Sequence, residues 1–94
     1  MAIADPVESS LNWARAAVGD ARDSVQAFGS AAELAASGTV DAVIVASPNF
    51  THRSVLEPLF DAGLHILCEK PLATTVDDAR WVADRAAASK GVFW

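Results

Sequence analysis

The sequence predicts an α/β fold in which short parallel strands alternate with helices in one small domain. Apolar runs alternate with amphipathic stretches along the 94 residues, a pattern typical of repeated βαβ units. The run Ala42–Ala46 is continuously apolar and mostly β-branched, and His65–Cys68 is a second strand-like run. Both predict parallel strands that are buried on both faces of a sheet.

The N-terminal part of the chain predicts two strands with a helix between them. Met1–Ala4 is an apolar run that stops at Asp5-Pro6, which predicts a strand leading into a turn. Ser24–Phe28 alternates weakly and predicts a second short strand. Between these strands, apolar residues recur at helical spacing until Gly19-Asp20; they are Val7, Leu11, Ala14 and Val18.

Two further helices are expected on either side of Ala42–Ala46. The capping-box pattern Ser30-Ala31-Ala32-Glu33 opens a short helix that Gly38 ends. The second helix ends at Gly63, and we expect Pro58 to kink it or delay its start, because proline lacks a backbone donor. Its apolar positions are Val55, Leu59 and Ala62.

The C-terminal part predicts one more helix and one more strand. Thr75-Val76-Asp77-Asp78 is a capping-box variant that opens the helix. Gly91–Trp94 has the apolar residues of a beginning strand. The expected apolar stripe of the helix is Val76, Ala79, Val82, Ala83 and Ala86.

Charge and composition argue against several functional classes. The net charge is −5 and the seven Lys and Arg residues are scattered, so no basic stripe for nucleic acid is present. Two distant histidines and the single Cys68 have no metal-ligand spacing, so no metal site is predicted. Neither a signal peptide nor a membrane-spanning run is visible, and one cysteine fits a reducing compartment, so we expect a cytoplasmic location.

Asp5 is the first candidate for ligand binding, because ligands of open parallel sheets bind beyond the carboxyl ends of the strands. A carboxylate at this place can accept hydrogen bonds from two ribose hydroxyls. It would also repel a 2′-phosphate, which favours NAD over NADP. The alternative is that Asp5-Pro6 only makes a turn before a helix.

Ser47-Pro48-Asn49 follows the clearest strand and leads to His52. Free backbone N–H groups at a helix N-terminus attract polar ligand atoms, so this segment is a candidate for cofactor binding. The alternative is a helix cap, in which Asn49 or Thr51 satisfies those donors. His52 alone would then be a surface residue of the first turn.

Glu69-Lys70-Pro71 is the third candidate. Proline holds the preceding residue extended, and the Lys70-Pro71 bond can be cis. Such a turn would aim the Lys70 ammonium at a nicotinamide amide or a substrate hydroxyl. The alternative is a solvated ion pair of Glu69 with Lys70. Cys68, just before the triplet, is expected to be a small buried side chain without a role as nucleophile.

In this order and spacing, Asp5, Ser47-Pro48-Asn49 with His52, and His65-Ile66-Leu67-Cys68-Glu69-Lys70-Pro71-Leu72-Ala73 resemble the N-terminal domain of the Gfo/Idh/MocA oxidoreductase family. The resemblance implies an incomplete Rossmann-type doubly wound parallel sheet over residues 1–94. It also implies hydride transfer between NAD(P) and a hydroxyl-bearing carbon of a sugar, inositol or related polyol, in an enzyme expected to be a homo-oligomer.

The resemblance assigns roles to single residues. Asp5 would contact the adenosine ribose, and Ser47, Pro48 and Asn49 would line the cofactor path, with His52 close behind. Glu69 and Lys70 would form the signature pair, with Lys70 near the nicotinamide and substrate as the catalytic residue. Pro71 would be cis.

The chain departs from the family pattern in two places. It has no G-x-G-x-x-G loop, and we expect it to begin at the second strand and to end at the sixth, as a truncated gene, a frameshift or a misplaced start would produce. Without the first strand, the edges of Ala2–Ala4 and Ala42–Ala46 would lack their common partner. The second domain, with the substrate pocket, would also be missing. We therefore expect that the chain alone neither binds NAD tightly nor turns over substrate.

Two other interpretations remain open. The chain could be a non-catalytic nucleotide-binding or protein-interaction module whose free sheet edges accept a strand from a partner. It could also be another doubly wound fold, such as a response-regulator-like domain. That fold needs an acidic cluster at the strand ends and does not explain Glu69-Lys70-Pro71.

Overall fold

The computed structural model describes all residues from Met1 to Trp94, which form two compact units, Met1–Val40 and Asp41–Trp94. Each unit contains one pair of parallel strands, and no strand of one pair is hydrogen-bonded to the other pair. None of the helices has the length and apolar character that crossing a bilayer requires.

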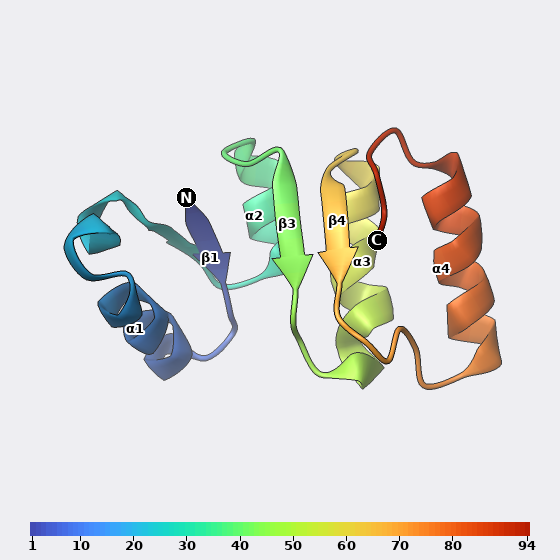
Figure 1. Cartoon of the computed structure of the whole chain (residues 1–94), viewed down its shortest axis with the longest axis horizontal. Coiled ribbons are helices and arrows are strands. Elements are labelled where there is room, and N and C mark those ends of the chain that lie inside the picture. Colours follow the sequence, from blue (N-terminus) through green and yellow to red (C-terminus); the bar gives the residue numbers. More distant parts are fainter. The chain divides into compact units, whose positions relative to one another are not determined.

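In the first unit, strand β1 (Ala2–Ala4) pairs in parallel with β2 (Gln26–Phe28). Helix α1 (Glu8–Ala17) and a 3₁₀ helix, η1 (Gly19–Ser24), connect the two strands, and α2 (Ala31–Ser37) follows (Figure 1). The predicted order of strand, helix, strand and helix is confirmed.

The 3₁₀ helix η1 was not predicted, and it delays β2 by two residues. The Ser24 hydroxyl donates to the Ala21 carbonyl at 2.7 Å, and the Val25 amide donates to Arg22 at 3.2 Å. Ser24 therefore closes a turn and cannot extend as a strand. A local side-chain-to-backbone bond competes here with the sheet, a common behaviour of serine.

The start of α2 follows the predicted capping box. Ser30 Oγ accepts from the Glu33 amide at 3.1 Å, and the Glu33 carboxylate accepts from the Gly29 amide at 2.8 Å. Gly38 has a φ of 64°, a left-handed conformation that suits glycine at a helix end. Sequence pattern and local structure agree in this element.

In the second unit, β3 (Ala42–Val45) pairs in parallel with β4 (His65–Cys68). A 3₁₀ helix, η2 (Asn49–Thr51), and helix α3 (His52–Asp61) connect them. Helix α4 (Val76–Ala88) follows β4, and the C-terminal segment returns beside that strand (Figure 1). Phe93 forms a parallel bridge with Ile66, which confirms strand pairing by the last residues.

The core of the second unit lies between α3, α4 and one face of the strands. Phe60 packs against Trp81 of α4 at 6.2 Å and against Phe93 at 5.3 Å between ring centroids. The Arg85 guanidinium pairs with Asp61 and lies 5.7 Å from the Trp81 ring. The apolar side chains buried here are Val45, Leu56, Leu59, Phe60, Leu64, Ile66 and Val82.

The prediction that both strands are buried on both faces is wrong for this chain. Ile44 is 74% exposed and Leu67 is 41% exposed, whereas Val45 and Ile66 are buried. Successive side chains of a strand point to opposite faces, and α3 packs against β3 on the face of the buried pair. The opposite face is not covered.

Two details of the predicted helices also need correction. α3 begins at His52, six residues before Pro58, so the proline does not delay its start. Ala62 donates to the Pro58 carbonyl at 3.1 Å, which continues the helix past the ring. In α4, Val76 is 67% exposed and Ala83 is also exposed. Both residues lie beside the face of α4 that packs against α3, and Val82 is buried on that face.

Candidate functional site at the carboxyl ends of β3 and β4

The carboxyl ends of β3 and β4 bring two of the three predicted segments together. Val45 lies opposite Cys68 in the strand register, and the Glu69 amide donates to the Val45 carbonyl at 2.9 Å. Ser47-Pro48-Asn49 and Glu69-Lys70-Pro71 therefore leave neighbouring strands at the same edge. This is the edge at which open parallel sheets bind ligands.

His52 connects the two segments from the first turn of α3. Its Nε2 lies 3.0 Å from the Ser47 carbonyl oxygen, and its Nδ1 lies 3.1 Å from the Leu72 carbonyl oxygen. The residue is only 1% exposed. The alternative that His52 is a surface residue is therefore wrong, since the ring is buried and both nitrogens face carbonyl groups of the chain.

The Glu69-Lys70-Pro71 turn is exposed, and its Lys70-Pro71 bond is cis. The Glu69 carboxylate accepts from the backbone amide of Lys70 at 3.3 Å, while no ion pair joins the two side chains. The alternative of a simple Glu69–Lys70 ion pair is therefore wrong. The Lys70 ammonium has no partner in the chain and can donate to a ligand.

The Ser47-Pro48-Asn49 segment enters α3 through η2. The Thr51 hydroxyl lies 2.6 Å from the Pro48 carbonyl and 3.0 Å from Ser47 Oγ. No side chain caps η2 or α3, so the alternative of a cap by Asn49 or Thr51 is wrong. The Asn49 amide side chain makes no hydrogen bond within the chain and is half-buried.

Asp5 lies directly after β1, in the unit Met1–Val40. Its amide donates to the Phe28 carbonyl at 3.1 Å, which extends the pairing of β1 with β2 by one bond. Its Oδ1 accepts from the Val7 amide at 2.7 Å. The turn that the alternative interpretation proposed therefore exists. It occupies only one carboxylate oxygen, and Oδ2 makes no hydrogen bond within the chain.

Cys68 lies beside His52 at the end of β4. Its Sγ is 3.5 Å from His52 Nδ1 and 3.6 Å from the Glu69 carbonyl oxygen. Burial raises the pKa of the Cys68 thiol, and the negative charge of Glu69 raises it further. A thiol with a raised pKa is a poor nucleophile at neutral pH, so this environment favours a packing role.

Sequence reasoning did not single out Leu72 as part of this site. It acts through its backbone carbonyl, which any residue type would supply, so no side-chain signature exists. Its place directly after the Glu69-Lys70-Pro71 triplet is the one signal the sequence offers. Ser47 was expected to line the cofactor path, and it contacts His52 through its backbone carbonyl.

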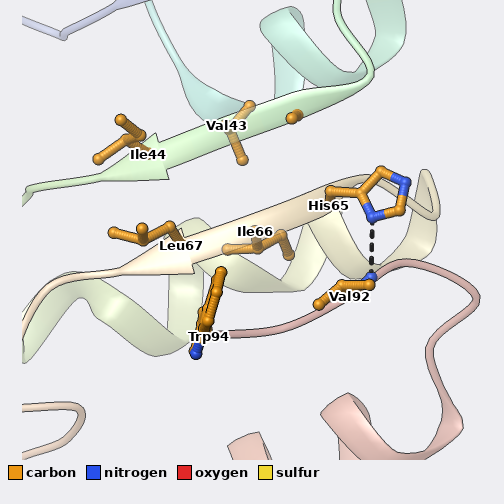
Figure 2. A pocket seen from close by; sticks show the side chains of 8 residues that line it. Val43, Ile44, His65, Ile66, Leu67, Val92 and Trp94 are labelled. Atoms are coloured by element: carbon orange, nitrogen blue, oxygen red, sulfur yellow. Dashed lines mark hydrogen bonds between the residues drawn. The ribbon is translucent and has the colours of Figure 1, made fainter.

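A hollow of about 470 Å³ lies apart from these loops, on the open face of β3, β4 and the C-terminal segment. Figure 2 shows Ile44, Leu67 and Trp94 around it, with His65 Nδ1 accepting from the Val92 amide at 3.0 Å. The lining contains no charged side chain. Its side-chain donors are only the ring N–H groups of His65 and Trp94, and no cation is present for a phosphate, so the loops rather than the hollow are the candidate site.

Residues 2–94 match the Gfo/Idh/MocA family, described as an oxidoreductase family with an NAD-binding Rossmann fold. The chain is 36% identical over 86 residues to the rhizopine catabolism protein MocA of Rhizobium meliloti, covering 90% of this chain and 25% of that protein. It is 42% identical over 74 residues to inositol 2-dehydrogenase 1 of Saccharopolyspora erythraea, covering 78% and 22%. A third relative, D-xylose 1-dehydrogenase (NADP(+)) 2 of Haloferax volcanii, is 40% identical over 77 residues, covering 81% and 24%.

Solved structures show the same relationship. A probable dehydrogenase from Thermotoga maritima aligns with a TM-score of 0.85 at 28% identity, covering 99% of this chain and 27% of that chain. The WlbA dehydrogenase of Bordetella pertussis, solved with NADH and UDP-GlcNAcA, also aligns at 0.85, with 27% identity and coverage of 98% and 27%. The chain thus spans about a quarter of the length of these relatives. It belongs to the Gfo/Idh/MocA oxidoreductase family, and its α/β structure is part of that family's NAD-binding Rossmann domain.

Proposed function

We propose that this chain carries part of the NAD(P) site of an oxidoreductase, from the second to the sixth strand of a Rossmann sheet. The reaction is hydride transfer between the nicotinamide and a hydroxyl-bearing carbon of a sugar, inositol or related polyol. One observation supports this most: Lys70 presents an unpaired ammonium at the carboxyl end of β4, beside the Ser47 segment. The names of relatives that act on inositol and xylose agree with this substrate class.

Each unit, taken by itself, carries polar groups that suit part of a dinucleotide. Asp5 keeps one free carboxylate oxygen, which can accept from a ribose hydroxyl, and the Asn49 amide is free to bind a polar cofactor atom. Lys70 lies in the turn that follows β4, where its amide donates to the Glu69 carboxylate. When bound, the nicotinamide supplies or accepts the hydride. We assign Asp5, Ser47, Pro48, Asn49, Glu69, Lys70 and Pro71 to its binding, with His52 behind them.

Lys70 is the residue that we assign to the chemistry. An ammonium carries three donors and no acceptor, so it can hydrogen-bond a substrate oxygen and stabilise negative charge that develops there. As the substrate hydroxyl loses its proton during oxidation, a nearby cation favours the alkoxide-like state. The free ammonium in this structure is a requirement of that role.

NAD is the proposed cofactor rather than NADP. The negative charge of the Asp5 carboxylate would repel the 2′-phosphate of NADP if Asp5 contacts the adenosine ribose. One relative is named for NADP(+), so family membership does not decide between NAD and NADP, and the assignment of NAD depends on Asp5. An Asp5→Ser variant is expected to lose most of the discrimination between NAD and NADP.

An NMR titration of ¹⁵N-labelled chain with NAD tests the assignment. We expect shift changes that are concentrated on the amides of 5, 47, 49, 69 and 70, because Pro48 and Pro71 have no N–H. Lys70→Ala is expected to weaken them, while the matched variant Lys90→Ala, at an exposed lysine distant in sequence, leaves them unchanged. Changes scattered over the surface, or equal effects of both variants, would refute the proposed site.

The affinity is expected to be low, because the glycines at 19, 29, 38, 63 and 91 form no G-x-G-x-x-G phosphate loop. Titration of the chain with NADH, followed by nicotinamide fluorescence, measures this directly. Saturation at micromolar NADH would show that the loop is dispensable and that the expectation of weak binding is wrong.

A second candidate function is protein interaction without catalysis. The open sheet face with Ile44, Val92 and Trp94, which are 74%, 61% and 83% exposed, favours it. Contiguous exposed apolar patches mark interaction surfaces. The NAD titration separates the two candidates, since an interaction module would show no specific changes at the amides of 47, 49, 69 and 70.

A further inference from the structure

We propose that His52 is a positioning residue that fixes the turn carrying Lys70 by bridging the Ser47 and Leu72 carbonyl groups. This inference rests on the proposed function, because fixing the turn affects the reaction only if Lys70 contacts the substrate. The contacts themselves belong to the chain alone. They can therefore be tested without any cofactor.

The geometry separates this role from ordinary packing. The ring is 1% exposed, and its two nitrogens lie 3.0 Å and 3.1 Å from the two carbonyl oxygens. Ser47 follows β3 and Leu72 follows the Lys70 turn, so one side chain spans both loops of the site. A leucine of similar volume would fill the same space but would hold neither loop.

The number of N–H groups on the His52 ring decides which of these contacts are hydrogen bonds. Both carbonyls are acceptors, and a neutral imidazole has one N–H, whereas an imidazolium has two. The doubly protonated ring donates to both loops. The neutral ring can donate from Nε2 to Ser47 and accept at Nδ1 from the Cys68 thiol, which lies 3.5 Å away. In that tautomer it donates nothing to Leu72, so holding the Lys70 turn requires a proton on Nδ1. The chain thus supplies a partner for each ring nitrogen in either form, and buried polar groups need such partners.

Spectroscopy of the unmodified chain tests the bridge first. A ring N–H that donates to a buried carbonyl exchanges slowly with water. We therefore expect an observable ring N–H signal for His52, with nuclear Overhauser contacts to residues beside Ser47 or Leu72. His65 provides the internal comparison, because it is exposed. A His52 ring N–H that exchanges as fast as that of His65 would overturn the proposal.

Two variants then separate bridging from packing. His52→Leu keeps an apolar core but removes both donors, and His52→Gln keeps one amide donor and one acceptor. We expect amide order parameters at 70 and 72 to fall in His52→Leu from about 0.85 to below about 0.6, values typical of rigid and flexible backbone. In His52→Gln they should recover at least in part.

The control is His65→Gln, which removes the acceptor for the Val92 amide and should leave residues 70 and 72 unchanged. If His52→Leu leaves the order parameters of this turn intact while the chain remains folded, His52 only packs, and the proposal fails. If His52→Leu unfolds the chain, the ring N–H exchange of the unmodified chain decides alone. A failed NAD titration with an intact bridge would count against the proposed function and not against the bridge.

Discussion

The Arg53 guanidinium donates a hydrogen bond of 2.7 Å to the Asp78 carboxylate, and this contact joins α3 to the first turn of α4. Thr75 contributes twice, because its hydroxyl donates to Asp78 at 2.9 Å and accepts from the Asp78 amide at 3.1 Å. Arg53 also lies 5.1 Å above the Trp81 ring. The start of α4 is thus fixed by a charge pair, a capping bond and an aromatic contact.

Acid is expected to weaken this junction. The bond from Arg53 lowers the pKa of Asp78 below its ordinary value of 3.8, and the bond from Thr75 lowers it further. A lowered pKa in the folded state adds stability that is complete above the ordinary value and is lost as the pH falls through the folded value. The free energy of unfolding, measured with urea, should therefore fall less between about pH 7 and about pH 3 in Asp78→Asn than in the unmodified chain.

The control for this prediction is the neighbouring Asp77, whose side chain is 89% exposed and lies 3.8 Å from Arg80. Asp77→Asn should keep the acid sensitivity of the unmodified chain. Equal pH profiles for Asp78→Asn and the unmodified chain would contradict the role of the Arg53–Asp78 pair.

Cys68 is expected to react slowly with alkylating reagents. Burial and the Glu69 charge raise its pKa, so less of the reactive thiolate is present at neutral pH. The rate of carboxamidomethylation should rise several-fold in urea, where both causes disappear. Glu69→Gln should raise the rate in the folded chain, while Glu57→Gln on the exposed surface of α3 should not. Equal carboxamidomethylation rates for the folded chain and for the chain in urea would contradict this prediction.

Gly91 is required where the chain turns back toward β4. A Cβ atom there would collide with the carbonyl group of Leu64. We expect Gly91→Ala to lower the free energy of unfolding by about 1–3 kcal/mol, the usual effect of overpacking. Gly29→Ala is the matched control, because its nearest contact would be the flexible Glu33 carboxylate at 3.4 Å. Similar losses for both variants would indicate a general effect of replacing glycine.

The centre of the second unit depends on Leu56, which is 0% exposed. Leu56→Ala should lower the free energy of unfolding by about 2–5 kcal/mol, through lost burial and a residual cavity. Val76→Ala is the comparison, since Val76 also lies on a helix but is 67% exposed, and it should cost far less. Chemical unfolding followed by circular dichroism measures both, and a small loss for Leu56→Ala would contradict the assigned core.

The residues of the candidate site were found from sequence because each follows a strand end. Lys70 and Asn49 could be located in this way, since parallel strands place their carboxyl ends at one edge. The hydrogen-bond partners of His52 could not be located from the sequence. They are backbone carbonyls of Ser47 and Leu72, and their approach depends on how two loops fold over one helix.

The sequence by itself determined the α-helices and strands, their order and the family. Periodicity, caps at Ser30 and Thr75, and the Glu69-Lys70-Pro71 triplet are local features that depend on neighbouring residues. Tertiary structure alone decided that His52 is buried as a bridge, that Lys70 has no ion pair, and that Ile44 lies on an open face. These properties arise from contacts between residues that are distant in sequence. Burial and hydrogen bonding are set by packing in three dimensions, and no local pattern encodes them.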